Sequence, residues 1–149
     1  MIRPATTADI PALVALGEAM HGESQYARFP WNARKVCGLM DWLLANDDGL
    51  LLVAELEGRV IGGFLGMVAD HWCLDTKLAT DFALYVEPGR RGGIQAARLV
   101  KAYREWAQGR GAPEPELGIT TGVNEAATAR LFQSQGFRPA GQLFRFRGD

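Results

Sequence analysis

The chain has 149 residues, of which 48% are hydrophobic and 22% charged, and its formal net charge is -1 at pH 7. This composition predicts one globular domain over residues 1–149 with enough apolar residues for a core. The near-zero charge gives no reason to expect nucleic acid as a partner, because nucleic-acid binding requires a clear basic excess. No apolar run reaches the ~20 residues that cross a bilayer, and no signal-peptide pattern is present, so we expect no membrane partner and a cytoplasmic location.

Hydropathy periodicity and turn residues divide the chain into helices and strands. Apolar residues three and four apart mark helices, whereas short apolar runs bounded by glycine, proline or asparagine mark strands. The elements expected in chain order are a strand at 2–3, helices at 10–20 and 32–46, strands at 50–56, 60–69 and 78–86, a helix from 93 to about 109, a strand at 117–122, a helix from 124 to about 135 and a strand at 143–147. This order predicts an α/β (α+β) fold with a mixed sheet and helices on both faces.

The turn between the strand at 78–86 and the next helix contains two arginines and two glycines, Arg90-Arg91-Gly92-Gly93. The first amides of a helix have no internal partner, and the helix dipole adds positive charge there. Glycine lets an anion approach the backbone closely, and arginine supplies fork-shaped donors suited to phosphate. We interpret the turn as a diphosphate-binding site at a helix N-terminus. The alternative is a solvated turn with two surface arginines.

This turn matches neither of the two common nucleotide-binding loops. A P-loop requires a Lys-Ser/Thr pair after its last glycine, and the dinucleotide fingerprint requires three spaced glycines. The turn has only the adjacent pair Gly92-Gly93 and no such Lys-Ser/Thr pair. The sequence therefore predicts a different phosphate-bearing ligand.

From Leu84 to Ala107 the sequence LYVEPGRRGGIQAARLVKAYREWA resembles the strand-turn-helix of the GNAT superfamily of acetyl-CoA-dependent N-acetyltransferases. The later segment GVNEAATARLFQSQGF is similar to the C-terminal Asn-to-Gly-Phe segment of that family, and the element order resembles the family over essentially the whole chain. The doubled arginine before Gly-Gly and AARLV is similar to phage- or prophage-encoded members.

The resemblance implies a GNAT-like fold, with a mostly antiparallel sheet of about six or seven strands and about four helices. It also implies acetyl-CoA (CoA) as co-substrate, no metal, and direct attack by a primary amine of a small molecule or peptide in a ternary complex. Many family members form homodimers, so a homodimer is expected through the final strand. A CoA-binding module with little or no transferase activity remains the alternative.

In the family the turn reads Arg/Gln-x-x-Gly-x-Gly/Ala, which falls here on residues 91–96 with Ile94 in place of a glycine. By the same resemblance, Leu84 and Val86 pair their backbone groups with the pantetheine arm. Asn124 corresponds to an asparagine that contacts this arm, or else it is a plain helix cap. The resemblance implies these cofactor-binding residues: Leu84, Val86, Arg91, Gly92, Gly93, Ile94, Gln95, Ala96, Ala97, Asn124 and Phe132.

The resemblance leaves two catalytic positions vacant. Family members often carry a tyrosine where this chain has Phe132, and some keep a glutamate where it has Thr80. We therefore expect catalysis to depend mainly on positioning and on a proton relayed by water. The candidate catalytic residues are Tyr85, Asp81 and Glu55, with Glu23, His21 and His71 as further candidate bases.

Overall fold

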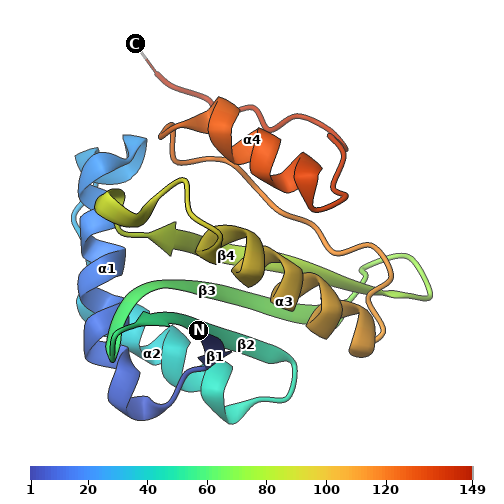
Figure 1. Ribbon diagram of the computed structural model, residues 1–149. Helices are drawn as coiled ribbons and strands as arrows, with labels where there is room; N and C mark the ends of the chain where they lie inside the picture. The colour runs from blue at the N-terminus through green and yellow to red at the C-terminus, as the bar shows by residue number, and fades with distance from the viewer. Residues whose placement is uncertain (149) are drawn as a thin grey trace.

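The structure is a computed structural model that describes residues 1–148 (Figure 1). Its sheet has the strand order β1-β2-β3-β4, and every neighbouring pair is antiparallel. The strands are β1 (Ile2–Pro4), β2 (Gly49–Leu56), β3 (Arg59–Asp70) and β4 (Lys77–Val86). The helices are α1 (Ile10–Glu23), α2 (Ala33–Ala45), α3 (Gln95–Gly109) and α4 (Glu125–Ser134), with short 3-10 turns η1 (Thr7–Asp9), η2 (Gln25–Arg28) and η3 (Pro88–Arg90).

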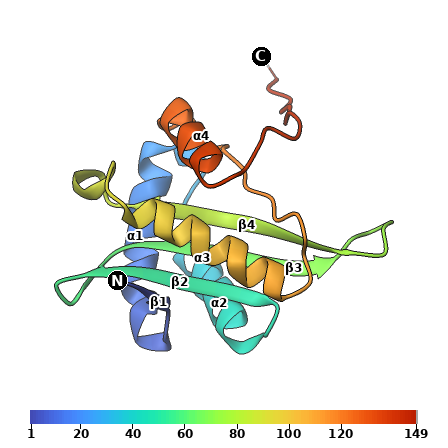
Figure 2. The same ribbon diagram turned by 45° about the vertical axis from the view of Figure 1, so that its right-hand side comes forward.

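Helices cover both faces of the sheet, so the molecule has two hydrophobic cores (Figure 2). On one face α3 packs against the strands, and the ring of Tyr103 stacks on that of Phe64 with centroids 4.5 Å apart. On the other face α1 and α2 cover the sheet, with Met40 and Leu43 in contact with residues of β2. Alternation along each strand sends neighbouring residues to opposite cores, which is why β2 and β3 are almost continuously apolar.

Glycines in β3 allow close packing. A Cβ added at Gly62 would lie 2.6 Å from the Tyr85 carbonyl oxygen, and one added at Gly63 would lie 2.6 Å from Leu13 Cδ2. These distances are shorter than any ordinary contact, so a larger residue would force the strand or the helix to move. The glycines thus hold β4 and α1 close to β3.

Two of the expected strands, at 117–122 and 143–147, are not formed within residues 1–148. The segment that follows α3 meets β4 only at its beginning, where Glu116 N–H donates to the Ala79 carbonyl at 2.9 Å and Gly118 N–H donates to Asp81 Oδ1 at 2.9 Å. It then leaves the strand, so no continuous ladder forms. The expectation of six or seven strands is therefore wrong for the described chain, and so is the expected mixed sheet, because every described pairing is antiparallel, whereas the four helices are confirmed.

No helix among residues 1–148 combines the length and apolar character needed to cross a membrane.

Candidate active site

One edge of β4 is fully paired and the other is mostly free. Glu87 N–H donates to the Ile61 carbonyl at 2.9 Å, so the backbone groups of Glu87 are directed toward β3. Because bonding alternates along an antiparallel strand, the backbone groups of Leu84 and Val86 point to the outer edge. Within residues 1–148, the bond that reaches this part of the edge comes from Arg91 Nε to the Val86 carbonyl, at 2.9 Å. The remaining groups are free to pair with an extended ligand.

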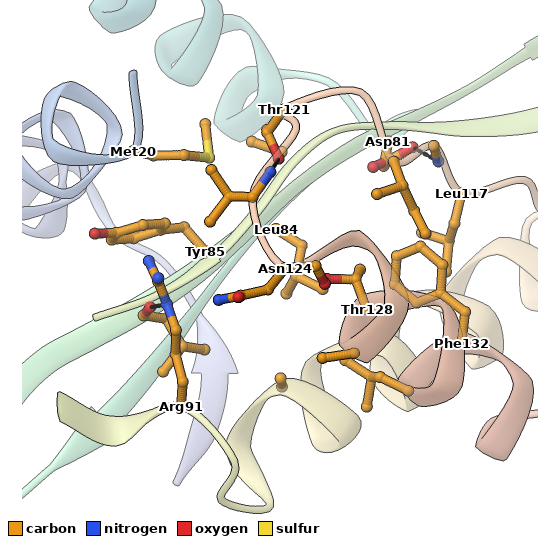
Figure 3. Close-up of a pocket in the computed structure, with 18 of the residues that line it drawn as sticks. Met20, Asp81, Leu84, Tyr85, Arg91, Leu117, Thr121, Asn124, Thr128 and Phe132 are labelled. Carbon is orange, nitrogen blue, oxygen red and sulfur yellow. Dashed lines mark hydrogen bonds between the residues drawn. The ribbon is translucent and has the colours of Figure 1, made fainter. Parts of the chain in front are cut away.

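A cavity of about 700 Å³ lies along this free edge (Figure 3). Its walls are β4, the end of α1, the turn before α3, the segment 116–121 and one face of α4. The cavity exists because segment 116–121 is tied to the start of β4 and then diverges, while α4 lies across the gap (Figure 1). Its volume is in the range of small-molecule sites.

The turn at one end of the cavity leaves consecutive backbone amides free. Arg91 N–H bonds back into the preceding turn at 3.3 Å, and the next bonded amide is that of Arg98, which donates to the Ile94 carbonyl at 3.0 Å. No described residue accepts a hydrogen bond from the amides of residues 92–97. Gly92 adopts a left-handed φ of 83°, which glycine tolerates without strain. These free amides at a helix N-terminus suit an anionic group such as a diphosphate.

The side chain of Arg91 is directed away from these amides. Its Nη1 donates to Glu23 Oε2 at 3.1 Å, a second contact joins Nη2 to Oε1, and the guanidinium lies 5.1 Å from the centre of the Tyr85 ring. The Arg91 guanidinium lowers the pKa of Glu23, whereas burial, aided by the Glu23 carboxylate, raises the pKa of Tyr85. Arg91 therefore joins the end of α1 to β4, and the free amides remain open.

Asn124 has a conformation that a plain helix cap does not need. Its φ of 47° and ψ of 42° are left-handed, and its side chain makes no capping hydrogen bond. The amide group instead points into the cavity (Figure 3). Its backbone carbonyl accepts from Thr128 N–H at 3.0 Å, so Asn124 begins α4 while its side chain lines the cavity.

A β-bulge changes the facing of side chains within β4. Leu65 pairs with Ala83, but the next residue of β3 pairs with Asp81, so Phe82 is the extra residue. Ahead of the bulge, Asp81 faces the α3 side, and Gly118 N–H donates to its Oδ1 at 2.9 Å. Burial raises the pKa of Asp81.

Most of the predicted cofactor-binding residues line one cavity. Three of them lie outside the lining: Ile94, which is 57% exposed at the end of the turn, and Gln95 and Ala97 at the start of α3. The lining includes Leu84, Val86, Arg91, Gly92, Gly93, Ala96, Asn124 and Phe132.

The catalytic candidates separate into two groups. Tyr85, Asp81 and Glu23 line the cavity, whereas His21 and His71 do not. Glu55 is also outside the lining, and the expectation that places it at the site is corrected here. Its Oε2 accepts from Arg3 Nη2 at 2.7 Å, and Arg3 in turn holds Asp9, so Glu55 belongs to an ion-pair network between β1 and β2.

Several lining residues were not expected from the sequence. Met20 comes from the last turns of α1 and Thr121 from the segment 116–121. Thr128 and Leu131 come from α4. No local motif marks these positions, because they meet only when the chain folds.

The profile of the acetyltransferase (GNAT) family matches residues 16–137. The chain belongs to this family. The GNAT resemblance of the sequence is thereby confirmed, and acetyl-CoA is the co-substrate that this family uses.

Human N-acetyltransferase 8 is 32% identical to this GNAT chain over 102 residues, which cover 68% of the chain and 44% of the human protein. The chain thus spans less than half the length of that relative.

Solved structures share the fold of this GNAT domain. A putative acetyltransferase from Agrobacterium tumefaciens superimposes with a TM-score of 0.78 at 18% identity, covering 99% of each chain. An aminoglycoside 6'-N-acetyltransferase from Acinetobacter haemolyticus gives 0.76 at 17% identity, covering 100% of this chain and 98% of the other. Glucosamine-6-phosphate N-acetyltransferase from Arabidopsis thaliana gives 0.76 at 14% identity, with the same coverage.

Proposed function

We propose that the protein transfers the acetyl group of acetyl-CoA to a primary amine of a small molecule or peptide, by direct attack of the amine in a ternary complex. The observation that supports this most strongly is one continuous path of unpaired backbone. The free outer edge of β4 at Leu84 and Val86 leads along the cavity to the free amides of residues 92–97. An amide-containing arm that ends in a diphosphate is complementary to both parts of this path.

The described residues fit such a molecule. The amides of residues 92–97 would hold the diphosphate, Leu84 and Val86 would pair with the amides of the arm, and Asn124 would bind the arm from the opposite wall. When bound, acetyl-CoA supplies a thioester, an acetyl donor activated toward amines. A backbone N–H of β4 near the bulge is placed to stabilise developing negative charge on the acetyl oxygen.

We place the acceptor amine at the end of the arm where the thioester lies, because its nitrogen must contact the acetyl carbon to attack it. An ammonium group has a reference pKa of ~10.4, so the acceptor must lose a proton before it attacks. Desolvation in this partly apolar cavity lowers that pKa, and water can accept the proton. Proteins of the same fold are named for acetylating aminoglycosides and glucosamine-6-phosphate, which supports a small-molecule amine.

The test measures thiol release from acetyl-CoA with a panel of amino sugars, polyamines and peptide amines, together with calorimetric binding of CoA. Release with at least one amine is the expected result. Binding of CoA without release for any amine would favour the second candidate, a CoA-binding module, which Phe132 and Thr80 suggest. Competition by ATP as strong as by CoA would contradict both.

We also propose that two copies of the chain associate through the C-terminal segment. Leu143, Phe144 and Phe146 are 73%, 85% and 93% exposed, and the backbone around them is unpaired within the described chain. Large apolar side chains exposed this close together are typical of an interaction surface. Light scattering on the purified protein tests this. A dimer that Phe144→Ser/Phe146→Ser converts to a monomer is expected, and a monomeric wild type at high concentration would overturn it.

A further inference from the structure

Asp81 lies on the cavity wall, and its carboxyl group has no role in the function proposed above. Its Oδ1 accepts from Gly118 N–H at 2.9 Å. Lysine and arginine side chains within residues 1–148 form no ion pair with it. Burial raises the pKa of this carboxyl, and acids with shifted pKa values are concentrated at active sites.

The phenol near Asp81 on the α3 side is already engaged in a hydrogen bond. From α3, the Tyr103 hydroxyl donates to the Glu116 carbonyl at 2.8 Å, and burial together with the nearby Asp81 carboxyl raises the pKa of that phenol. The other charged residues that line the cavity are Glu23, Arg90, Arg91, Glu116 and Arg130. Phe132 lies at the same end of the cavity as Asp81 (Figure 3) and has no proton to give.

The length of the arm places the reacting sulfur close to this acid. The chain of pantetheine between diphosphate and sulfur is about as long as four residues of extended peptide, roughly 14 Å. Four residues back along β4 from Val86 is Phe82, the extra residue of the bulge, which is next to Asp81. Figure 3 shows Arg91 and Tyr85 at one end of the cavity and Asp81 at the other, which agrees with an arm that lies along the strand.

We propose that Asp81 is the general acid that gives its proton to the sulfur of coenzyme A as the thiol departs, a role that rests on the proposed transferase activity. The carbon-nitrogen bond to the acceptor forms and the carbon-sulfur bond breaks, with its electron pair passing to sulfur. Asp81 donates its proton to that sulfur. Water takes the proton lost by the acceptor nitrogen and returns one to the carboxylate, so amine and thioester give amide and free thiol.

The first test is Asp81→Asn, because asparagine keeps the shape and can still accept from Gly118 N–H. With the best amine of the panel, we expect kcat to fall by about a hundredfold and the Kd for CoA to change by less than about threefold. Adding Phe132→Tyr places a phenol near the position of the lost acid. We expect kcat of the double variant to be at least about tenfold higher than that of Asp81→Asn. Unchanged kcat in Asp81→Asn overturns the proposal, as does a loss that the tyrosine does not rescue.

The second test does not depend on turnover. In protein with ¹³C-labelled aspartate, the carboxyl signal of Asp81, assigned from its absence in Asp81→Asn, is recorded with CoA and with desulfo-CoA. We expect the signal to differ between the two ligands, while that of the exposed Asp70 stays the same. A signal that does not respond to the sulfur overturns the placement of the acid. If the protein binds CoA but acetylates no amine, the proposed function fails, and this signal still decides whether Asp81 lies at the thiol.

Discussion

The backbone groups on the two edges of β4 lie in opposite environments. Along the inner edge the strand pairs with β3 from Lys77 to Val86, interrupted only by the bulge. Along the outer edge it is bonded by Glu116 and Gly118 near its start and by Arg91 near its end. The inner edge holds the two cores together, whereas the outer edge lines the cavity.

This difference explains how a short domain combines stability with binding. The paired edge carries closely packed glycines and large buried residues, which fix the position of β4. The strand therefore keeps its shape although the backbone groups of its other edge are unpaired, and a ligand can form hydrogen bonds with these groups. Substitutions at the two edges are expected to affect different measured quantities.

The largest effect is expected at the paired edge, for Gly62→Ala. Its Cβ would lie 2.6 Å from the Tyr85 carbonyl oxygen, a backbone atom that cannot turn aside, so β3 and β4 must separate. We expect a loss of about 3 kcal/mol in the free energy of unfolding, measured by chemical denaturation. Gly38→Ala on the exposed side of α2 is the matched control, and it should gain about 0.5 kcal/mol because no atom lies within 4 Å of its Cβ. Equal behaviour of the two variants would contradict close packing at this edge.

The next effect is expected at the open edge, for Gly93→Glu. The new carboxylate stands among the free amides and repels a diphosphate, while its Cβ makes only an ordinary contact, 3.5 Å from the Arg90 carbonyl. We expect calorimetry to show CoA binding about thirtyfold weaker, equivalent to about 2 kcal/mol, with little change in stability. Gly89→Glu adds the same charge outside the cavity lining and should weaken binding by less than about threefold. Similar losses in both variants would point to general charge repulsion instead.

A smaller effect is expected far from β4, for Asp9→Asn. The Arg3 guanidinium bonds both oxygens of Asp9, at 2.8 and 2.9 Å, and holds the pKa of that carboxyl well below its ordinary value of 3.8. A depressed pKa stabilises the fold above pH 3.8, and this contribution is lost as the pH falls below it. Urea unfolding at neutral pH should show a loss of about 1.5 kcal/mol that shrinks in acid. The exposed Asp70→Asn should stay within about 0.5 kcal/mol of the wild type.

The smallest effect is expected for Arg91→Gln. Its guanidinium is bonded to the half-buried Glu23 carboxylate, so we expect a loss of about 0.5 kcal/mol in stability and less than threefold in CoA affinity. Arg90→Gln, which removes the same charge from a more exposed side chain, is the comparison. If Arg91→Gln alone weakens CoA binding by more than about tenfold, the guanidinium must leave Glu23 for the phosphates.

Local features of the fold follow directly from residue type. Glu57-Gly58 predicts a tight hairpin, and both residues have a positive φ, 51° and 75°. Asn32 predicts a helix start, and its Oδ1 accepts from Lys35 N–H at 3.1 Å. Gly136 predicts the end of α4, and the following amide donates to the Phe132 carbonyl at 3.0 Å. Each depends on a few adjacent residues, so the sequence is sufficient.

Long-range features were predicted less well. The strand expected at 117–122 has the right residue types, but a strand is stable only when its backbone is paired, and this segment diverges from β4 after Gly118. The ion pair of Arg91 with Glu23 joins residues 68 positions apart, and no local sequence pattern predicts it. The sequence predicted the turn and Asn124 as candidate binding residues, whereas the far wall of the cavity depends on that divergence.

The bulge at Phe82 has a consequence for how such a cavity can change over time. One additional residue in β4 reverses the alternation, so that Asp81 shares a face with Leu84 and Val86 instead of with Ala83 and Tyr85. Point substitutions can replace the group at any one of these positions, but they cannot exchange the two faces. Only an insertion or a deletion can do that. The face on which Asp81 lies is therefore set by the number of residues in β4 and not by which residues they are.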